Sequence, residues 1–246
     1  DHCLKLFSEE SKTWNPIEET FLSKLMKIER IDSRNQHHGE KLLSIDIVSA
    51  NFSVLKKYYN SNNQEFYDDW NGLCKKLGID PFLSESKSFR QYCFGLYQPK
   101  TVRRLQEHYI HGILELLKEW LNVKDNDIIF VSSDEIVLSM KHLTSFEVSN
   151  LLSGYSLPPL KFIEYTSTYV DKHCILLTKS LSDKEKTFIF GVPENRYYMY
   201  FKKFISNEPI IEADRYFWND GAVAIWGDEI EFNKIVKSYE RTEQSL

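Results

Sequence analysis

The chain has 246 residues, of which 42% are hydrophobic and 27% charged, a composition typical of a globular protein that buries a sizeable core. Its formal net charge of −5 argues against a uniformly basic protein that coats nucleic acid, but it does not exclude a local basic groove. No apolar run approaches the roughly 20 residues that a membrane-spanning helix needs, and no secretory signal is visible. We therefore expect an intracellular protein of the cytoplasm or nucleus, not secreted and with no membrane partner.

The four cysteines are widely spaced and form no CxxC pair. Zinc sites and disulfide frameworks usually need closely or regularly spaced cysteines. We therefore expect reduced thiols in a reducing compartment rather than a zinc site or a set of disulfides.

Helical patterns dominate the first half of the chain. Asn15-Pro16 is typical of a helix start with proline at the first helical position, and Gly78 is typical of the residue just past a helix end. A stripe of apolar residues with the helical period predicts a long amphipathic helix over Thr101–Leu121. The expected elements are helices at 17–30, 52–59, 64–77, 85–97 and 101–121, a polar loop at 32–40 and a buried strand at 42–48.

Strand patterns dominate from residue 127 onward. Two apolar runs, Ile128–Val131 and Ile136–Leu138, flank the polar residues Ser132–Glu135, and this pattern predicts a β-hairpin with a tight polar tip. Thr144 and Glu147 have the spacing of a capping box, which starts a short helix. The expected elements are that helix at 146–152, strands at 161–168, 173–179 and 187–191, a helix at 194–204 and a last helix at 228–241.

These elements predict an α+β fold, an antiparallel sheet with helices packed on one face. No internal repeat, low-complexity tract or convincing linker interrupts the sequence. We therefore expect a single domain over residues 1–246.

Acidic residues lie at two positions where an ionised carboxylate is energetically unfavourable. Asp46 lies inside an otherwise apolar strand, and a lone buried carboxylate costs several kcal/mol unless something pairs with it. Asp134 and Glu135 lie at the tip of the apolar hairpin. If the Asp46 strand lies beside this hairpin, the three carboxylates cluster at one end of the sheet, where divalent cations are the usual counter-charge. Two metal ions roughly 3.5–4 Å apart support in-line phosphoryl transfer.

Two stretches resemble the metal-binding motifs of palm-domain polymerases and reverse transcriptases. Ser44–Phe52 resembles the first motif, a strand-borne aspartate followed by a small residue and an aromatic residue as a helix begins. Ser132–Glu135 resembles the second motif, the acidic hairpin. A predicted helix between them resembles the fingers helix that grips the incoming triphosphate and stacks on the template; it carries Lys87, Arg90, Gln91, Tyr92 and Gly95.

The resemblance implies a palm-like, ferredoxin-like core over residues 42–60 and 122–204, a helical fingers-like insertion over 61–121 and a C-terminal extension over 205–246. It also implies a template-directed nucleotidyltransferase whose partners are a nucleic-acid template or primer and a nucleoside triphosphate. Asp46 and Asp134 would bind two Mg²⁺ or Mn²⁺ ions, with Glu135 as a supporting catalytic acid. The implied substrate-binding residues are Lys87, Arg90, Gln91, Tyr92, Asn51 and Phe52, and the implied nucleic-acid contacts are Arg103, Arg104, Lys202 and Lys203.

Other interpretations stay open at this point. The hairpin acids can be ordinary turn residues, Asp46 can bond to nearby backbone or to a lysine, and the basic residues can form a solvated helix face. A tRNA-histidine guanylyltransferase, which shares the palm, has a glycine-bearing acidic motif that Arg30–Arg34 imitates only loosely. No thumb is recognisable after Tyr200. The chain could therefore be a non-catalytic palm-like subunit of a larger replication or viral assembly, or rely on a protein partner that supplies the thumb.

Overall fold

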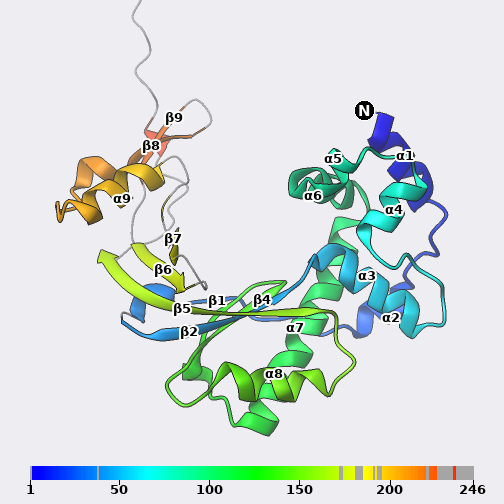
Figure 1. Ribbon diagram of the computed structural model, residues 1–246, viewed down its shortest axis with the longest axis horizontal. Helices are drawn as coiled ribbons and strands as arrows, with labels where there is room; N and C mark the ends of the chain where they lie inside the picture. The colour runs from blue at the N-terminus through cyan, green and yellow to red at the C-terminus, as the bar shows by residue number, and fades with distance from the viewer. Residues whose placement is uncertain are drawn as a thin grey trace, which may run out of the picture. The chain divides into compact units, whose positions relative to one another are not determined.

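The computed structural model describes residues 2–37, 39–171, 174–180, 185–190, 192, 196–219, 222–225 and 235–236 (Figure 1). Its α-helices are α1 (His2–Ser11), α2 (Glu19–Lys24), α3 (Ala50–Ser61), α4 (Trp70–Lys76), α5 (Pro81–Glu85), α6 (Lys87–Leu96), α7 (Pro99–Leu121), α8 (Ser145–Ser153) and α9 (Tyr197–Ile205). Its strands are β1 (Ile31–Asp32), β2 (Lys41–Ile47), β3 (Ile128–Val131), β4 (Glu135–Ser139), β5 (Leu160–Asp171), β6 (Cys174–Ser180), β7 (Glu185–Phe190), β8 (Tyr216–Asn219), β9 (Ala222–Ile225) and β10 (Ile235–Val236).

Seven of the strands form an open antiparallel sheet in the order β1-β3-β4-β2-β5-β6-β7. Strands β10, β9 and β8 form a second, three-stranded sheet. The predicted α+β class and the antiparallel sheet are therefore confirmed.

The chain folds into two compact units, each made of two separate stretches. The first unit contains Asp1–Asp32 and Leu43–Ile163, and the second contains Ser33–Leu42 and Glu164–Leu246.

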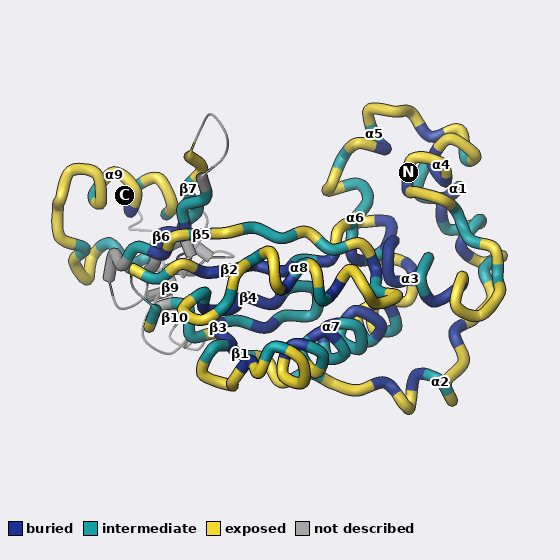
Figure 2. Tube along the Cα trace, turned by 60° about the horizontal axis from the view of Figure 1, so that its bottom comes forward, coloured by how far each residue is buried: buried dark blue, intermediate teal, exposed yellow. Residues whose placement is uncertain are grey.

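The core of the first unit lies between one face of β2 and β4 and the long helix α7. Side chains alternate between the two faces of a strand, so Leu43, Ile45 and Ile47 of β2 share one face, and all three are buried in this core. Ile113 and Leu117 of α7 belong to the same cluster of buried residues. Figure 2 shows the run of buried residues along β2 and β4.

An aromatic cluster joins four helices of the first unit. Phe94 of α6 lies with its ring centroid 5.5 Å from that of Phe7 in α1 and 5.5 Å from that of Trp70 in α4. Phe52 of α3 lies 6.5 Å from Phe94. Aromatic rings in such contacts contribute both buried area and favourable ring–ring geometry. The cluster therefore fixes α6, the predicted substrate-binding helix, against the body of this unit.

The second unit has its own small core. Leu176 of β6, Ile189 of β7 and Tyr200 of α9 are buried together. These residues show that α9 packs against one face of the β6–β7 pair. The opposite face of this pair carries Lys186 and Phe188, with the Lys186 ammonium 5.1 Å from the centre of the Phe188 ring.

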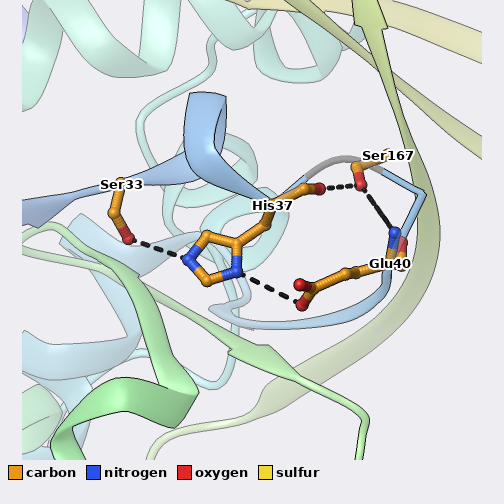
Figure 3. Close-up of polar contacts among 4 residues, drawn as sticks. All are labelled: Ser33, His37, Glu40 and Ser167. Atoms are coloured by element: carbon orange, nitrogen blue, oxygen red, sulfur yellow. Dashed lines mark hydrogen bonds and ion pairs between the residues drawn. The ribbon is translucent and has the colours of Figure 1, made fainter.

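A polar network fixes the segment before β2 against β5 in the second unit. His37 lies with Nε2 3.3 Å from the Ser33 hydroxyl and Nδ1 3.2 Å from the Glu40 carboxylate (Figure 3). The Ser167 hydroxyl of β5 accepts a hydrogen bond from the Glu40 amide at 3.2 Å and donates to the His37 carbonyl. Although serine, histidine and glutamate also occur in nucleophilic sites, here the Ser167 hydroxyl satisfies backbone groups of a loop, and the His37 ring lies between the side chains of Ser33 and Glu40. We therefore interpret the network as structural.

Replacing Ser167 by Ala should destabilise the second unit by about 1–3 kcal/mol, because buried backbone groups of the His37–Glu40 segment lose their partner. Urea denaturation followed by circular dichroism measures the change, and hydrogen exchange at the Gly39 amide, which donates to the Ser167 carbonyl, reports on the segment itself. Thr166→Ala, an exposed neighbour on the same strand, is the matched control. Equal effects of the two substitutions would contradict this role for Ser167.

Three predicted helices have different bounds from those expected. The helix expected at 17–30 is only α2, which ends where Leu25 is extended and the Leu22 carbonyl accepts from both the Leu25 amide and the Arg104 guanidinium. The helix expected at 64–77 begins at Trp70, where the Asp69 carboxylate caps the Gly72 amide at 2.6 Å. The helix expected at 85–97 is preceded by the separate helix α5, and Ser86 caps the start of α6 through the Phe89 amide.

Other regions depart further from the expectations. Helix α1 and strands β1, β8 and β9 were not predicted. A continuous helix over 228–241 is wrong, because Ile235–Val236 pair with β9 as strand β10. The rest of that range lies outside the described residues, as do His38, His173, Gly191, Glu194 and Asn195 of other predicted elements. No helix in the described part of the chain has the length and apolar character needed to cross a bilayer.

Candidate functional site

Asp46 lies near the end of β2, on the face opposite the α7 core. Its neighbours Ile45 and Ile47 point into that core, so the alternation of the strand turns Asp46 to the other face, where it is half-buried. Ser44 shares this face, and its buried hydroxyl donates a 2.6 Å hydrogen bond to Oε1 of Glu135 on β4. Acidic groups of both strands therefore lie on one face of the sheet.

The acidic hairpin formed by β3 and β4 lies beside β2, as the acid-cluster hypothesis required. The Ile47 amide donates to the Asp134 carbonyl at 2.9 Å, so Asp134 stands next to the strand end that carries Asp46. The Ser132 hydroxyl donates to Oδ1 of Asp134 at 3.1 Å and holds this carboxylate at the tip. Sequence positions far apart in the chain are thus brought together here.

The three carboxylates influence one another electrostatically. Burial is the largest cause, and together with the negative charges of Glu135 and then Asp134 it raises the pKa of Asp46 to about 6. The positive charges of Lys161 and Lys87 lower it in part. Desolvation and like charges both disfavour the ionised carboxylate. A cation bound beside Asp46 would favour the ionised form.

This raised pKa gives a testable pH dependence in metal-free protein. The unfolded chain releases the Asp46 proton near pH 4 and the folded chain near pH 6, so the contribution of this group to stability is lost as pH rises from about 4 to 6. Above pH 6, Asp46→Asn should therefore be more stable than the natural chain, by about 1–2 kcal/mol after allowance for solvent screening. Urea denaturation at several pH values measures the difference, which should vanish near pH 4. A difference that does not change with pH would contradict the shift.

A cavity of about 320 Å³ joins the acids to basic and polar groups from the neighbouring helices. Its lining includes Asp46, Asn51, Lys87, Arg90, Gln91, Gln106, Asp134 and Lys161. Six of these were predicted as site residues. The side chains of Lys87 and Arg90 form no hydrogen bond or ion pair with the described part of the chain, although the Lys87 charge acts on Asp46. Both cations are therefore available to an anionic ligand in the cavity.

Two predicted substrate contacts lie outside this cavity. Phe52 is only 4% exposed and belongs to the aromatic cluster, and it lines a neighbouring cavity instead. Tyr92 is 60% exposed on α6 and does not line the acidic cavity. Asn51 does line it, and its Oδ1 accepts a 2.9 Å hydrogen bond from Nε2 of Gln106 on α7.

Three of the four predicted nucleic-acid contacts are engaged within the chain. Arg103 forms an ion pair with Glu107 at 2.9 Å along α7, and Arg104 donates to the Leu22 carbonyl. Lys203 of α9 pairs with the Asp214 carboxylate and donates to the Pro209 carbonyl at 3.3 Å. Lys202 is exposed on the same helix. Lys202 and Lys203 belong to the second unit, whereas Arg103 and Arg104 belong to the first.

The donor set fits a hard divalent cation. Asp46 and Asp134 line one cavity and offer carboxylate oxygens, which Mg²⁺ and Mn²⁺ prefer. In the described part of the chain, no three His, Cys, Asp or Glu side chains form a ready-made metal-binding group. Mg²⁺ usually keeps several waters and binds one or two carboxylates plus substrate phosphates. Asp46 and Asp134 would therefore hold such ions together with ligand and water oxygens.

Sequence reasoning missed three residues of the site. Lys161, at the start of β5, and Gln106, in the middle of α7, line the cavity, and Ser44 orients Glu135. Ser44 and Gln106 are polar residues among apolar neighbours in a predicted strand and helix, and this pattern could have identified them. Lys161 gave no such indication, because a lysine at a strand start is ordinary.

No protein-family model matches the sequence, and no curated protein shows significant similarity to it. The function is therefore inferred from the geometry of the site.

Proposed function

We propose that this chain is a palm-type nucleotidyltransferase that binds a nucleoside triphosphate in the acidic cavity and transfers its nucleotide to a nucleic-acid end. The observation that carries the proposal is the cavity that contains the strand-borne Asp46, Asp134 at the hairpin tip, and the cations of α6, Lys87 and Arg90. The order of a strand-borne aspartate, a helical insertion and an acidic hairpin supports the resemblance to palm polymerases. Strand β5 would then belong to the rest of a palm-like core, and α7 to the helical insertion.

Each residue has a role that follows from its charge and place. Asp46 and Asp134 would hold two divalent ions, which when bound activate the attacking oxygen and stabilise the leaving one. Arg90 and Lys87 neutralise triphosphate oxygens, because charge develops on the departing pyrophosphate. Glu135, fixed by the Ser44 hydroxyl, adds negative charge beside Asp46 and keeps that site attractive to cations. Asn51 and Gln91 offer amide groups to the sugar or phosphates.

The test is incorporation of labelled nucleotides with Mg²⁺ or Mn²⁺, on primed DNA and RNA templates and on single strands. Arg90→Ala should raise KM for the nucleoside triphosphate by about 10–100-fold, since a hydrogen bond to a charged group is worth about 1.5–3 kcal/mol. Lys75→Ala, an exposed cation of α4 that does not line the cavity, should leave KM unchanged. Absence of incorporation under all these conditions, together with absence of nucleotide binding, would refute the proposal.

A second candidate is a non-catalytic palm-like subunit that binds protein or nucleic acid within a larger assembly. The internal ion pairs of Arg103 and Lys203 favour it, because a duplex-binding groove needs several available cations. Nucleotide binding without incorporation would select this candidate. Incorporation only in the presence of an added protein would instead indicate a partner that supplies the thumb.

A further inference from the structure

A second cavity, of about 490 Å³, adjoins the acidic one in the first unit. Val48, Ser49 and Arg90 line both cavities, so the two are neighbours across the junction of β2 and α3. Ser49 at this junction has left-handed backbone angles, φ 50° and ψ 47°, which are uncommon for a residue other than glycine. Such strain tends to persist where the surrounding structure fixes a functional conformation.

The wall of the second cavity is largely apolar and includes planar groups. It contains Val48, Phe52, Trp70, Leu157, Pro158 and Pro159. Pockets for small ligands typically combine apolar and aromatic walls with a few polar groups that fix orientation. Two amides, Asn60 at the end of α3 and Asn71 on α4, supply such polar groups at the rim.

The lysines of this second cavity already have partners. Lys56 donates to the Asp68 carbonyl at 2.6 Å and lies 4.0 Å from the Asp68 carboxylate, and Lys57 donates to the Ser156 hydroxyl. Arg90, between the two cavities, has no such partner among the described residues. The positive charge available to phosphate therefore lies toward the acidic cavity, and the second cavity suits a planar, weakly polar group.

We infer that the second cavity binds the nucleobase of the nucleoside triphosphate whose phosphates occupy the acidic cavity. This inference rests on the proposed function. Arg90 contacts the phosphates at the boundary, and the base lies between the Phe52–Trp70 wall and the Leu157–Pro159 segment. The protein itself then distinguishes nucleotides before any template pairs with them. A purely template-directed site would have no reason to prefer one base in the absence of nucleic acid.

The experiment is isothermal titration calorimetry of the full chain with Mg²⁺, in the absence of nucleic acid. The probes are ATP, GTP, CTP, UTP and inorganic tripolyphosphate. We expect at least one nucleotide to bind tenfold or more tightly than tripolyphosphate and the four nucleotides to differ. Asn60→Trp, which fills the rim of the second cavity, should remove this advantage and leave tripolyphosphate binding unchanged. Ser61→Trp, on the next exposed position outside the cavity, is the matched control.

The outcomes separate this inference from the proposal on which it rests. If tripolyphosphate and all four nucleotides bind equally, the base-binding inference is overturned and the phosphate site stands. If neither tripolyphosphate nor any nucleotide binds, both fail. Asn71→Trp, which fills the same rim from α4, repeats the test should Asn60→Trp unfold. If a folded variant that fills the cavity binds nucleotides with unchanged affinity, the inference is also overturned.

Discussion

Asp46→Asn is expected to reduce metal-dependent nucleotide incorporation by at least about 10³-fold while leaving the protein folded, because it removes a carboxylate that would bind both metal ions. The amide has the same shape and no charge, so the packing around β2 is kept. Its neutral side chain also removes the cost of ionising a half-buried acid whose pKa is raised to about 6. The melting temperature of metal-free protein at pH 7 should therefore rise by about 2–4 °C or more.

The combination of lost activity and raised stability is the diagnostic result. A residue that merely supports the fold would lose both together. Asp134→Asn should lower incorporation to a similar extent, whereas Asp125→Asn, an exposed partner of Lys118, should leave it unchanged. Nucleotide incorporation and thermal unfolding, each measured with and without Mg²⁺, provide the readouts. Full incorporation by Asp46→Asn would remove this residue from the mechanism.

Phe94→Ala is expected to have the largest effect on stability, a loss of about 3–5 kcal/mol. Phe94 is 2% exposed and contacts the rings of Phe7 and Trp70, so truncation leaves a cavity where α1, α4 and α6 meet. Since natural domains are stable by about 5–15 kcal/mol, this loss is a large share of the total. It should also disturb α6, which carries Lys87 and Arg90 into the acidic cavity.

Urea denaturation followed by tryptophan fluorescence and circular dichroism measures this change. Leu96→Ala is the matched control, since Leu96 lies two residues away on the same helix and is 57% exposed. It should change stability by about 0.5 kcal/mol or less. Comparable losses in the two variants would show that helix propensity, rather than the aromatic cluster, holds α6.

Features encoded by neighbouring residues could be predicted from the sequence. Thr144 and Glu147 form the expected reciprocal capping box, with the Thr144 hydroxyl accepting from the Glu147 amide at 3.2 Å and Glu147 accepting from the Thr144 amide at 3.0 Å. Gly78 has the positive φ of 67° expected just after a helix end. The strands of the acidic hairpin were also predicted to within a residue. In each case the physical cause lies within a few residues of the element.

Features that depend on distant residues could not be predicted in this way. Helix α1 is held in place by the packing of Phe7 against Phe94 and Trp70, which lie far along the chain. Lys161 enters the site only because the start of β5 lies near the end of β2, where the Val48 amide donates to the Pro159 carbonyl. Asp46 was found because an acid inside an apolar strand conflicts with its local environment, and such conflicts are informative without knowledge of the fold.

The interleaving of the two units constrains how the chain can be synthesised and divided. Glu40 leaves the ribosome long before its partner Ser167, which lies 127 residues further along, so the second unit cannot complete its fold until most of the first has been made. Neither unit corresponds to one continuous stretch. A cut near residue 164 therefore separates the 33–42 segment from the strand that pairs with it, and expression of either half alone yields an incomplete unit. Dissection of this protein calls for point substitutions, or for circular permutation that rejoins the stretches of each unit.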